Sequence, residues 1–159
     1  MTTEGNNERS MRPPRIFPPV YLLAAIISMV ALHKLLPGAA LIASPWRWLG
    51  LLPFVAAVAL ATAAVRLFRK HGTTIKPGET SSYLLAEGPY RYTRNPIYLG
   101  MVLLLTGVAL MLGSLTPWLM VPVFAWLINR NVIPVEEEMM ATAFGADYEQ
   151  YRARVRRWL

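Results

Sequence analysis

A long uncharged segment in the second half of the sequence constrains the fold more than any other feature. Residues 95–129 contain no Asp, Glu, Lys or Arg, and as a single helix they would be about 50 Å long. The hydrocarbon core of a bilayer is only about 30 Å thick. The segment is interrupted by residue types that favour turns: Gly113, Ser114, Thr116 and Pro117. The sequence therefore predicts two membrane-spanning helices joined by a turn.

The composition supports a membrane location for the whole chain. Of its 159 residues, 55% are hydrophobic and only 16% are charged, which is more apolar surface than a soluble domain of this size can bury. Residues 46–65 have the length of a further span, with Trp46 and Trp48 suited to the interface and Arg47 able to extend out of the membrane.

Residues 16–36 form a less regular apolar segment. Pro18 and Pro19 lie at its start, and His33 and Lys34 lie near its end. A cleaved signal peptide is the competing interpretation, but no small-residue cleavage site in a polar setting follows Leu36. We expect this segment to remain as the first membrane anchor.

The expected fold is an all-α integral membrane protein with about four transmembrane helices and interfacial C-terminal helices. The predicted parts share a simple alternation of membrane and water-facing segments: an N-terminal tail (1–15), two spans (16–68), a connection (69–96), a transmembrane hairpin (97–133) and C-terminal helices (134–159).

The cationic residues predict the orientation of these spans. Most of them fall in the N-terminal tail, the central connection or the C-terminal region: Arg9, Arg12, Arg15, Arg66, Arg69, Lys70, Lys76, Arg91, Arg94, Arg130, Arg152, Arg154, Arg156 and Arg157. Only Lys34 and Arg47 fall in the opposite loops. Because positive residues remain on the cytoplasmic side, we expect both termini and the connection to be cytoplasmic in an inner or plasma membrane.

Several classes of function are disfavoured. The net charge of +7 is accounted for by this topology and by attraction to anionic headgroups, so nucleic-acid binding is not expected. The chain has no cysteine, and His33 and His71 fall on opposite sides of the predicted membrane, so we expect no metal site. It also lacks the glycine-rich motifs of soluble nucleotide-binding domains.

A polar stretch, "EGPYRYTRNPIYLG", precedes the third predicted span. Interfacial tyrosines and arginines, with turns at Lys76–Gly78 and at Gly88, would explain part of the connection as simple anchoring. However, Pro96 suits the first turn of a helix and Asn95 the N-cap before it. The free N–H groups and positive end of such a helix form a receptive site for a carboxylate.

The C-terminal region supplies acidic residues at the same predicted membrane edge. Pro134 can begin a helix whose first turn contains Glu136, Glu137 and Glu138, where the helix dipole alone would favour acidic residues. These are three of only nine acidic residues, and a carboxylate near the membrane requires a cationic partner. They are therefore also candidates for a binding site.

The last residues predict an amphipathic interfacial helix. Gly145 would end the preceding helix and Asp147 would cap the next. Apolar and aromatic residues then recur at helical spacing: Tyr148, Tyr151, Val155 and Trp158. The arginines of this helix are expected to face headgroups or water: Arg152, Arg154, Arg156 and Arg157.

Together, "GPYRYTRNPIYLG" and "EEEMMATAFGADYEQYRARVRRWL" resemble the isoprenylcysteine carboxyl methyltransferase and phospholipid methyltransferase superfamily of small membrane enzymes. The resemblance covers residues 83–159. The residues that fit the family pattern are Gly88, Tyr90, Arg94, Pro96, Tyr98, Glu136, Glu137, Phe144, Gly145, Tyr148 and Tyr151. Asn95 stands where histidine is common, so any role of an imidazole at that position is lost.

The resemblance implies S-adenosylmethionine as the methyl donor. The implied cofactor-binding residues flank the transmembrane hairpin: Leu84, Leu85, Tyr90, Arg94, Asn95, Pro96, Tyr98, Glu136 and Glu137. Arg94 and the helix end at Asn95 suit the carboxylate, and Glu136 or Glu137 suits the ammonium or the ribose hydroxyls. No catalytic residue is assigned. Arg130 could pair with an acidic acceptor, but we favour its interpretation as an ordinary membrane-edge arginine.

The expected acceptor is a lipophilic or lipid-linked molecule that is methylated at the cytoplasmic face. A carboxylate acceptor, as in isoprenylcysteine methylation, would need no base, whereas a lipid amine would first have to lose a proton. Phospholipid N-methylation therefore remains an alternative. A non-enzymatic four-helix membrane protein that keeps the motif as a scaffold is the other alternative.

Overall fold

The computed structural model describes residues 17–72 and 83–159, and in these ranges the chain is mostly helical. The helices are α1 (Pro18–Leu35), η1 (Trp46–Gly50), α2 (Leu51–Lys70), η2 (Gly88–Arg91), α3 (Pro96–Leu112), η3 (Thr116–Leu119), α4 (Met120–Asn131), α5 (Ile133–Phe144) and α6 (Ala146–Arg154). The described part contains no strand, only one isolated bridge between Ala40 and Ser114. The predicted all-α fold is confirmed.

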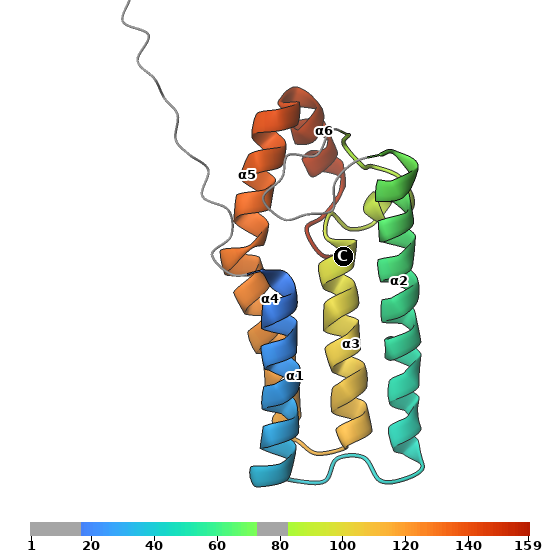
Figure 1. Cartoon of the computed structure of the whole chain (residues 1–159), viewed down its shortest axis with the longest axis vertical. Coiled ribbons are helices and arrows are strands. Elements are labelled where there is room, and N and C mark those ends of the chain that lie inside the picture. Colours follow the sequence, from blue (N-terminus) through green and yellow to red (C-terminus); the bar gives the residue numbers. More distant parts are fainter. Residues whose placement is uncertain (1–16, 73–82) are drawn as a thin grey trace, which may run out of the picture.

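Helices α1 to α4 run lengthwise beside one another, with α3 in the middle (Figure 1). α3 packs against α2 on one side and against α1 and α4 on the other. We call the end where α2 finishes, α3 begins and α5 and α6 lie the motif end. The other end, which carries the α1–η1 connection and the turn between α3 and η3, is the turn end.

Prolines and glycines set the helix boundaries. α1, α3 and α5 each have a proline at their first or second position, where the missing N–H would have no partner in the helix. Gly113 ends α3 with φ of 73°, and its N–H donates to the Ala109 carbonyl. This left-handed conformation favours glycine because glycine has no Cβ. The predicted hairpin turn is therefore present.

The contact of α3 with η1 and α2 is unusually close because it uses glycines. A Cβ on Gly107 would lie 2.7 Å from the Gly50 carbonyl oxygen, and one on Gly50 would lie 2.5 Å from the Gly107 carbonyl oxygen. A Cβ on Gly100 would lie 3.3 Å from the Ala57 carbonyl oxygen. Small residues allow membrane helices to approach at their backbones, and dispersion then stabilises the pair.

The helices have the length and composition of membrane spans. Three segments of the described chain are long and apolar enough to cross a bilayer: Pro18–Leu35, Trp46–Lys70 and Thr116–Phe144. α3, with 17 residues, is a shorter apolar helix, close to the minimum length for crossing. The predicted second span ended at residue 65, but the helix continues to Lys70.

At the turn end, Arg47 does not extend outward as expected. Its Nε donates to the Ile42 carbonyl oxygen at 2.9 Å, and its guanidinium lies against Gly113. His33 Nδ1 and Ser114 Oγ share a hydrogen bond of 2.8 Å. These contacts hold the α1–η1 connection against the α3 turn, because polar groups near apolar helices gain more from internal partners than from partial hydration.

The prediction of one continuous helix through Trp158 was wrong. α6 ends at Arg154, and Val155 is extended, with φ of −118° and ψ of 129°. Asp147 lies in the first turn of α6, whose N-cap is Gly145 and not Asp147. The last residues turn back toward the start of α3 (Figure 1), because their carbonyl groups accept hydrogen bonds there.

Candidate functional site at the motif end

The predicted site residues of α3 and α5 meet at the motif end. The Tyr98 hydroxyl donates to Glu136 Oε1 at 2.6 Å. Tyr98 is buried, Glu136 is partly buried, and Tyr98 packs in the same core as Ile133 at the start of α5. A hydrogen bond to a carboxylate away from water is among the stronger ones in a protein, so this contact fixes one helix start against the other.

A second contact at this end is ionic. Arg94 Nη2 lies 3.1 Å from Glu137 Oε1. Arg157 binds the same carboxylate with two N–H groups, Nε to Oε1 at 3.0 Å and Nη2 to Oε2 at 2.5 Å. The hydrogen bond with Glu137 raises the pKa of Arg157 above its ordinary value. Two guanidinium groups thus share one carboxylate.

Arg94 retains hydrogen-bonding capacity in this arrangement. Its side chain is only 11% exposed, and among the described residues its Nε and Nη1 have no hydrogen-bond partner. Buried N–H groups are almost always paired in proteins, and a charged one is especially costly to leave unpaired. The arrangement has the donors and the surplus positive charge needed to bind an anion.

Asn95 occupies the predicted N-cap position but does not cap α3 with its side chain. Its Nδ2 donates instead to the Arg157 carbonyl oxygen at 2.9 Å, and its backbone N–H donates to Thr93 Oγ1 at 3.1 Å. The Asn95 side chain therefore anchors the C-terminal segment, while Pro96, also buried, begins α3 without an N–H.

Tyr90 lies in η2 and is buried together with Leu85 and Ala64 of α2. The Tyr151 hydroxyl of α6 donates to the Tyr90 carbonyl oxygen at 2.8 Å. Burial raises the pKa of both phenols above the ordinary value, so both remain neutral. Leu84 precedes this cluster in irregular, partly buried chain. Of the cofactor-binding residues that the resemblance implies, Leu85 and Tyr90 are thus adjacent to α2, and Tyr90 is also adjacent to α6.

Arg130 lies in the last turn of α4. It is exposed, and its guanidinium sits over the ring of exposed Trp126, with Cζ 5.7 Å from the ring centroid. An arginine stacked on an interfacial tryptophan suits the membrane-edge interpretation better than a role in the acceptor site.

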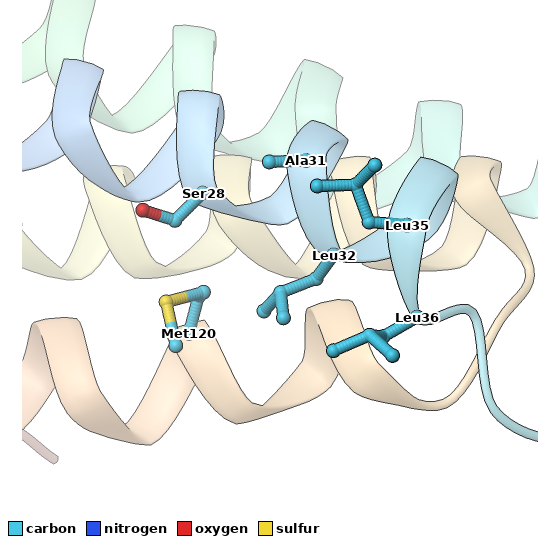
Figure 2. A pocket seen from close by; sticks show the side chains of 6 residues that line it. All are labelled: Ser28, Ala31, Leu32, Leu35, Leu36 and Met120. Carbon is cyan, nitrogen blue, oxygen red and sulfur yellow. The ribbon is translucent and has the colours of Figure 1, made fainter.

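One surface hollow, of about 370 Å³, lies away from this site (Figure 2). It lies between α1 and the start of α4, toward the turn end, and is lined by Ser28, Ala31, Leu32, Leu35, Leu36 and Met120. Its lining is almost wholly apolar, so it offers few groups for a charged nucleoside.

Sequence reasoning missed four residues of the site. They are Thr93, Asn129 and Arg157, which connect the C-terminal segment to α3, α4 and α5, and Tyr151, which was matched to the family pattern without a contact. Thr93 is 64 residues away in the sequence from its partner Arg157, and Arg157 is 20 residues away from its partner Glu137. No local pattern reports such pairings.

Comparison with known proteins gives the class of protein to which the chain belongs. The phospholipid methyltransferase family matches residues 45–147. This segment includes η2, α3, the two site glutamates Glu136 and Glu137, and Gly145 between α5 and α6. The protein is an all-helical membrane protein of a methyltransferase kind. The chain belongs to the phospholipid methyltransferase family.

Two relatives are similar to parts of the chain. One is Protein-S-isoprenylcysteine O-methyltransferase of Schizosaccharomyces pombe, 33% identical over 72 residues, or 45% of this chain and 30% of the yeast protein. The other is an uncharacterized protein of Haemophilus influenzae, 40% identical over 63 residues, or 40% of this chain and all of that protein. The chain thus matches less than a third of the yeast enzyme's length. No solved structure matches the chain.

Proposed function

We propose that the protein is an S-adenosylmethionine-dependent methyltransferase that methylates a lipophilic or lipid-linked acceptor, preferably at a carboxylate, at the cytoplasmic membrane face. The observation that carries this proposal is Arg94. Two of its buried N–H groups have no partner among the described residues, and it lies beside Glu137, with Glu136 the preceding residue of α5. The similarity to the yeast isoprenylcysteine enzyme supports the carboxylate preference.

The residues present fit the proposed donor. Arg94 provides N–H groups for its carboxylate, and Glu136, whose Oε1 accepts from Tyr98, provides Oε2 for the ammonium or the ribose hydroxyls. Leu84, Leu85 and Tyr90 provide an apolar edge for the adenosine. When bound, S-adenosylmethionine supplies an electrophilic methyl group on a positively charged sulfur.

The protein's contribution to the chemistry is orientation and exclusion of water. The site is fixed by contacts between α3, α5 and the C-terminal segment, so the groups that bind the donor have little freedom to reorient. A carboxylate acceptor arrives as an anion and needs no base, so we assign no catalytic residue. For a lipid amine, Glu136 would be the nearest candidate to accept the proton.

A binding measurement tests the donor site. Purified protein in detergent is expected to bind S-adenosylmethionine in the micromolar range, and Arg94→Gln is expected to weaken binding at least tenfold. The matched control is Arg91→Gln, because Arg91 is exposed on η2. Wild-type protein that does not bind the donor would rule out the enzymatic proposal and favour a scaffold function.

A labelling experiment separates the acceptor classes. Membranes that contain the protein are incubated with methyl-labelled S-adenosylmethionine, and the product is treated with base. Release of the label as methanol supports a carboxyl ester, whereas label that resists base supports an N-methylated lipid amine. Efficient labelling of water-soluble acceptors, without preference for lipid-linked ones, would contradict a lipophilic acceptor.

The proposed orientation can be tested by cysteine labelling, because the chain has no natural cysteine. Thr142→Cys reports the motif end and Ala43→Cys the turn end, and both residues are exposed. In intact cells, a membrane-impermeant thiol reagent is expected to label only the cysteine at position 43. The opposite pattern would reverse the proposed orientation.

A further inference from the structure

The segment after α6 runs across the beginning of α3 and is held there by its backbone. The Arg94 N–H donates to the Arg156 carbonyl oxygen at 3.0 Å. The Arg157 carbonyl oxygen accepts from Thr93 Oγ1 at 3.1 Å and from Asn95 Nδ2 at 2.9 Å. Thr93, Arg94 and Asn95 thus hold the backbone of Arg156 and Arg157 in place. This backbone position sets where the Arg157 side chain begins.

The Arg157 side chain has a partner for each guanidinium nitrogen. Nε and Nη2 bind the two oxygens of Glu137, and Nη1 donates to Asn129 Oδ1 at 3.1 Å. Trp158 Nε1 donates to the same Asn129 oxygen at 3.3 Å. A bidentate arginine–carboxylate pair has a fixed planar geometry, so Glu137 cannot rotate without losing these bonds.

This pairing determines what remains for Arg94. Glu137 uses both oxygens on Arg157 and shares only Oε1 with Arg94 Nη2. The carboxylate therefore cannot form a bidentate pair with Arg94, and Nε and Nη1 of Arg94 stay unpaired among the described residues. The cluster of Arg94, Arg157 and Glu137 carries two positive charges and one negative charge.

We propose that Arg157 is a positioning residue for the methyl donor: it holds Glu137 away from a bidentate pair with Arg94 and so reserves Arg94 for the carboxylate of the donor. The inference rests on the proposed function. It makes a distinctive prediction, because removing Arg157 affects recognition of that carboxylate more than recognition of the adenosine. Without Arg157, Glu137 can form a bidentate pair with Arg94 through Nη2 and one of the two unpaired nitrogens.

The experiment compares two ligands that differ only in this carboxylate, S-adenosylmethionine and its decarboxylated form. Affinities are measured by calorimetry for wild-type protein and for R157Q, R157K and R152Q in detergent. Arg152 is the matched control because it lies on α6, is 52% exposed and pairs with Glu149 at 3.4 Å. Thermal unfolding of each variant without ligand reports structural damage separately.

Wild-type protein and R152Q are expected to prefer S-adenosylmethionine at least tenfold over the decarboxylated form. In R157Q this preference is expected to fall at least fivefold, while affinity for the decarboxylated form changes less than threefold. R157K keeps the charge but has no planar fork, so its preference is expected to lie between the two. This second variant allows the test even where R157Q is too unstable to purify.

Three results would overturn the inference. Equal weakening of both ligands in R157Q would indicate a purely structural role, and an unchanged preference in R157K would show that the fork is not needed. A wild-type protein that binds both ligands equally well would show that Arg94 does not recognise the carboxylate. Wild-type protein that binds neither ligand would instead refute the proposed function itself, so the two failures are distinguishable.

Discussion

The hydrogen bond between Tyr98 and Glu136 gives a quantitative test of the site. Tyr98→Phe removes only the hydroxyl that donates to Glu136 Oε1 at 2.6 Å. The ring that fills the core next to Ile128 and Ile133 is unchanged, so little cavity energy is added. Hydrogen bonds to charged groups contribute about 1.5–3 kcal/mol, and this is the expected loss in the free energy of unfolding.

The measurement is a double-mutant cycle. Unfolding free energies are obtained by denaturant titration in detergent for wild type, Tyr98→Phe, Glu136→Ala and the double variant. The expected coupling energy is about 1.5–3 kcal/mol, because the removal of either partner abolishes the same bond. In a protein of this size, such a loss would lower the thermal midpoint by about 3–12 °C. Tyr92→Phe is the control, since Tyr92 lies between η2 and α3 and is 72% exposed.

The same variant tests the role of Glu136 toward the donor. If Tyr98 orients this carboxylate, Tyr98→Phe lowers the affinity for S-adenosylmethionine about tenfold, which corresponds to about 1.4 kcal/mol. The reasoning would be refuted if Tyr98→Phe lowered the affinity equally in the presence and in the absence of the Glu136 side chain. The two side chains would then act independently.

Three further substitutions test contacts elsewhere in the described structure. Gly107→Ala is expected to destabilise the protein by about 1–3 kcal/mol in detergent unfolding, because its Cβ would lie 2.7 Å from a backbone oxygen of η1; an unchanged midpoint would show that α2 and α3 are not closely packed. Tyr151→Phe leaves the Tyr90 carbonyl without its hydroxyl donor, so a loss of about 1 kcal/mol is expected in the same assay, and no loss would argue against docking of α6 on η2. The hydrogen bond between the His71 ring and the Glu87 carboxylate holds the pKa of Glu87 below its ordinary value. This hydrogen bond therefore stabilises the protein above the ordinary glutamate pKa, and the stabilisation is lost as the pH falls through the lowered value. Glu87→Gln should remove this acid-side decrease in the thermal midpoint, and a variant whose pH profile is identical to that of wild type would contradict the expectation.

The sequence by itself determined the helical class of the fold and some of the helix boundaries. The uncharged length of residues 95–129 requires a hairpin, and Pro96 and Gly113 mark the two ends of its first helix, because backbone conformation and bilayer thickness act locally along the chain. The motif residues were also predicted, including the meeting of Arg94 and Tyr98 with the acidic start of α5.

Only the tertiary structure decided the partners of the side chains. Arg157 was expected to face water or headgroups, but it binds Glu137, and the Asn95 amide binds the Arg157 carbonyl instead of capping α3. The helical spacing of Tyr151 and Trp158 predicted a helix through the end of the chain, although α6 stops at Arg154. The reason is physical: a buried charge or carbonyl takes whichever partner the fold brings near, and proximity between distant segments is a property of packing that periodicity along the chain does not contain.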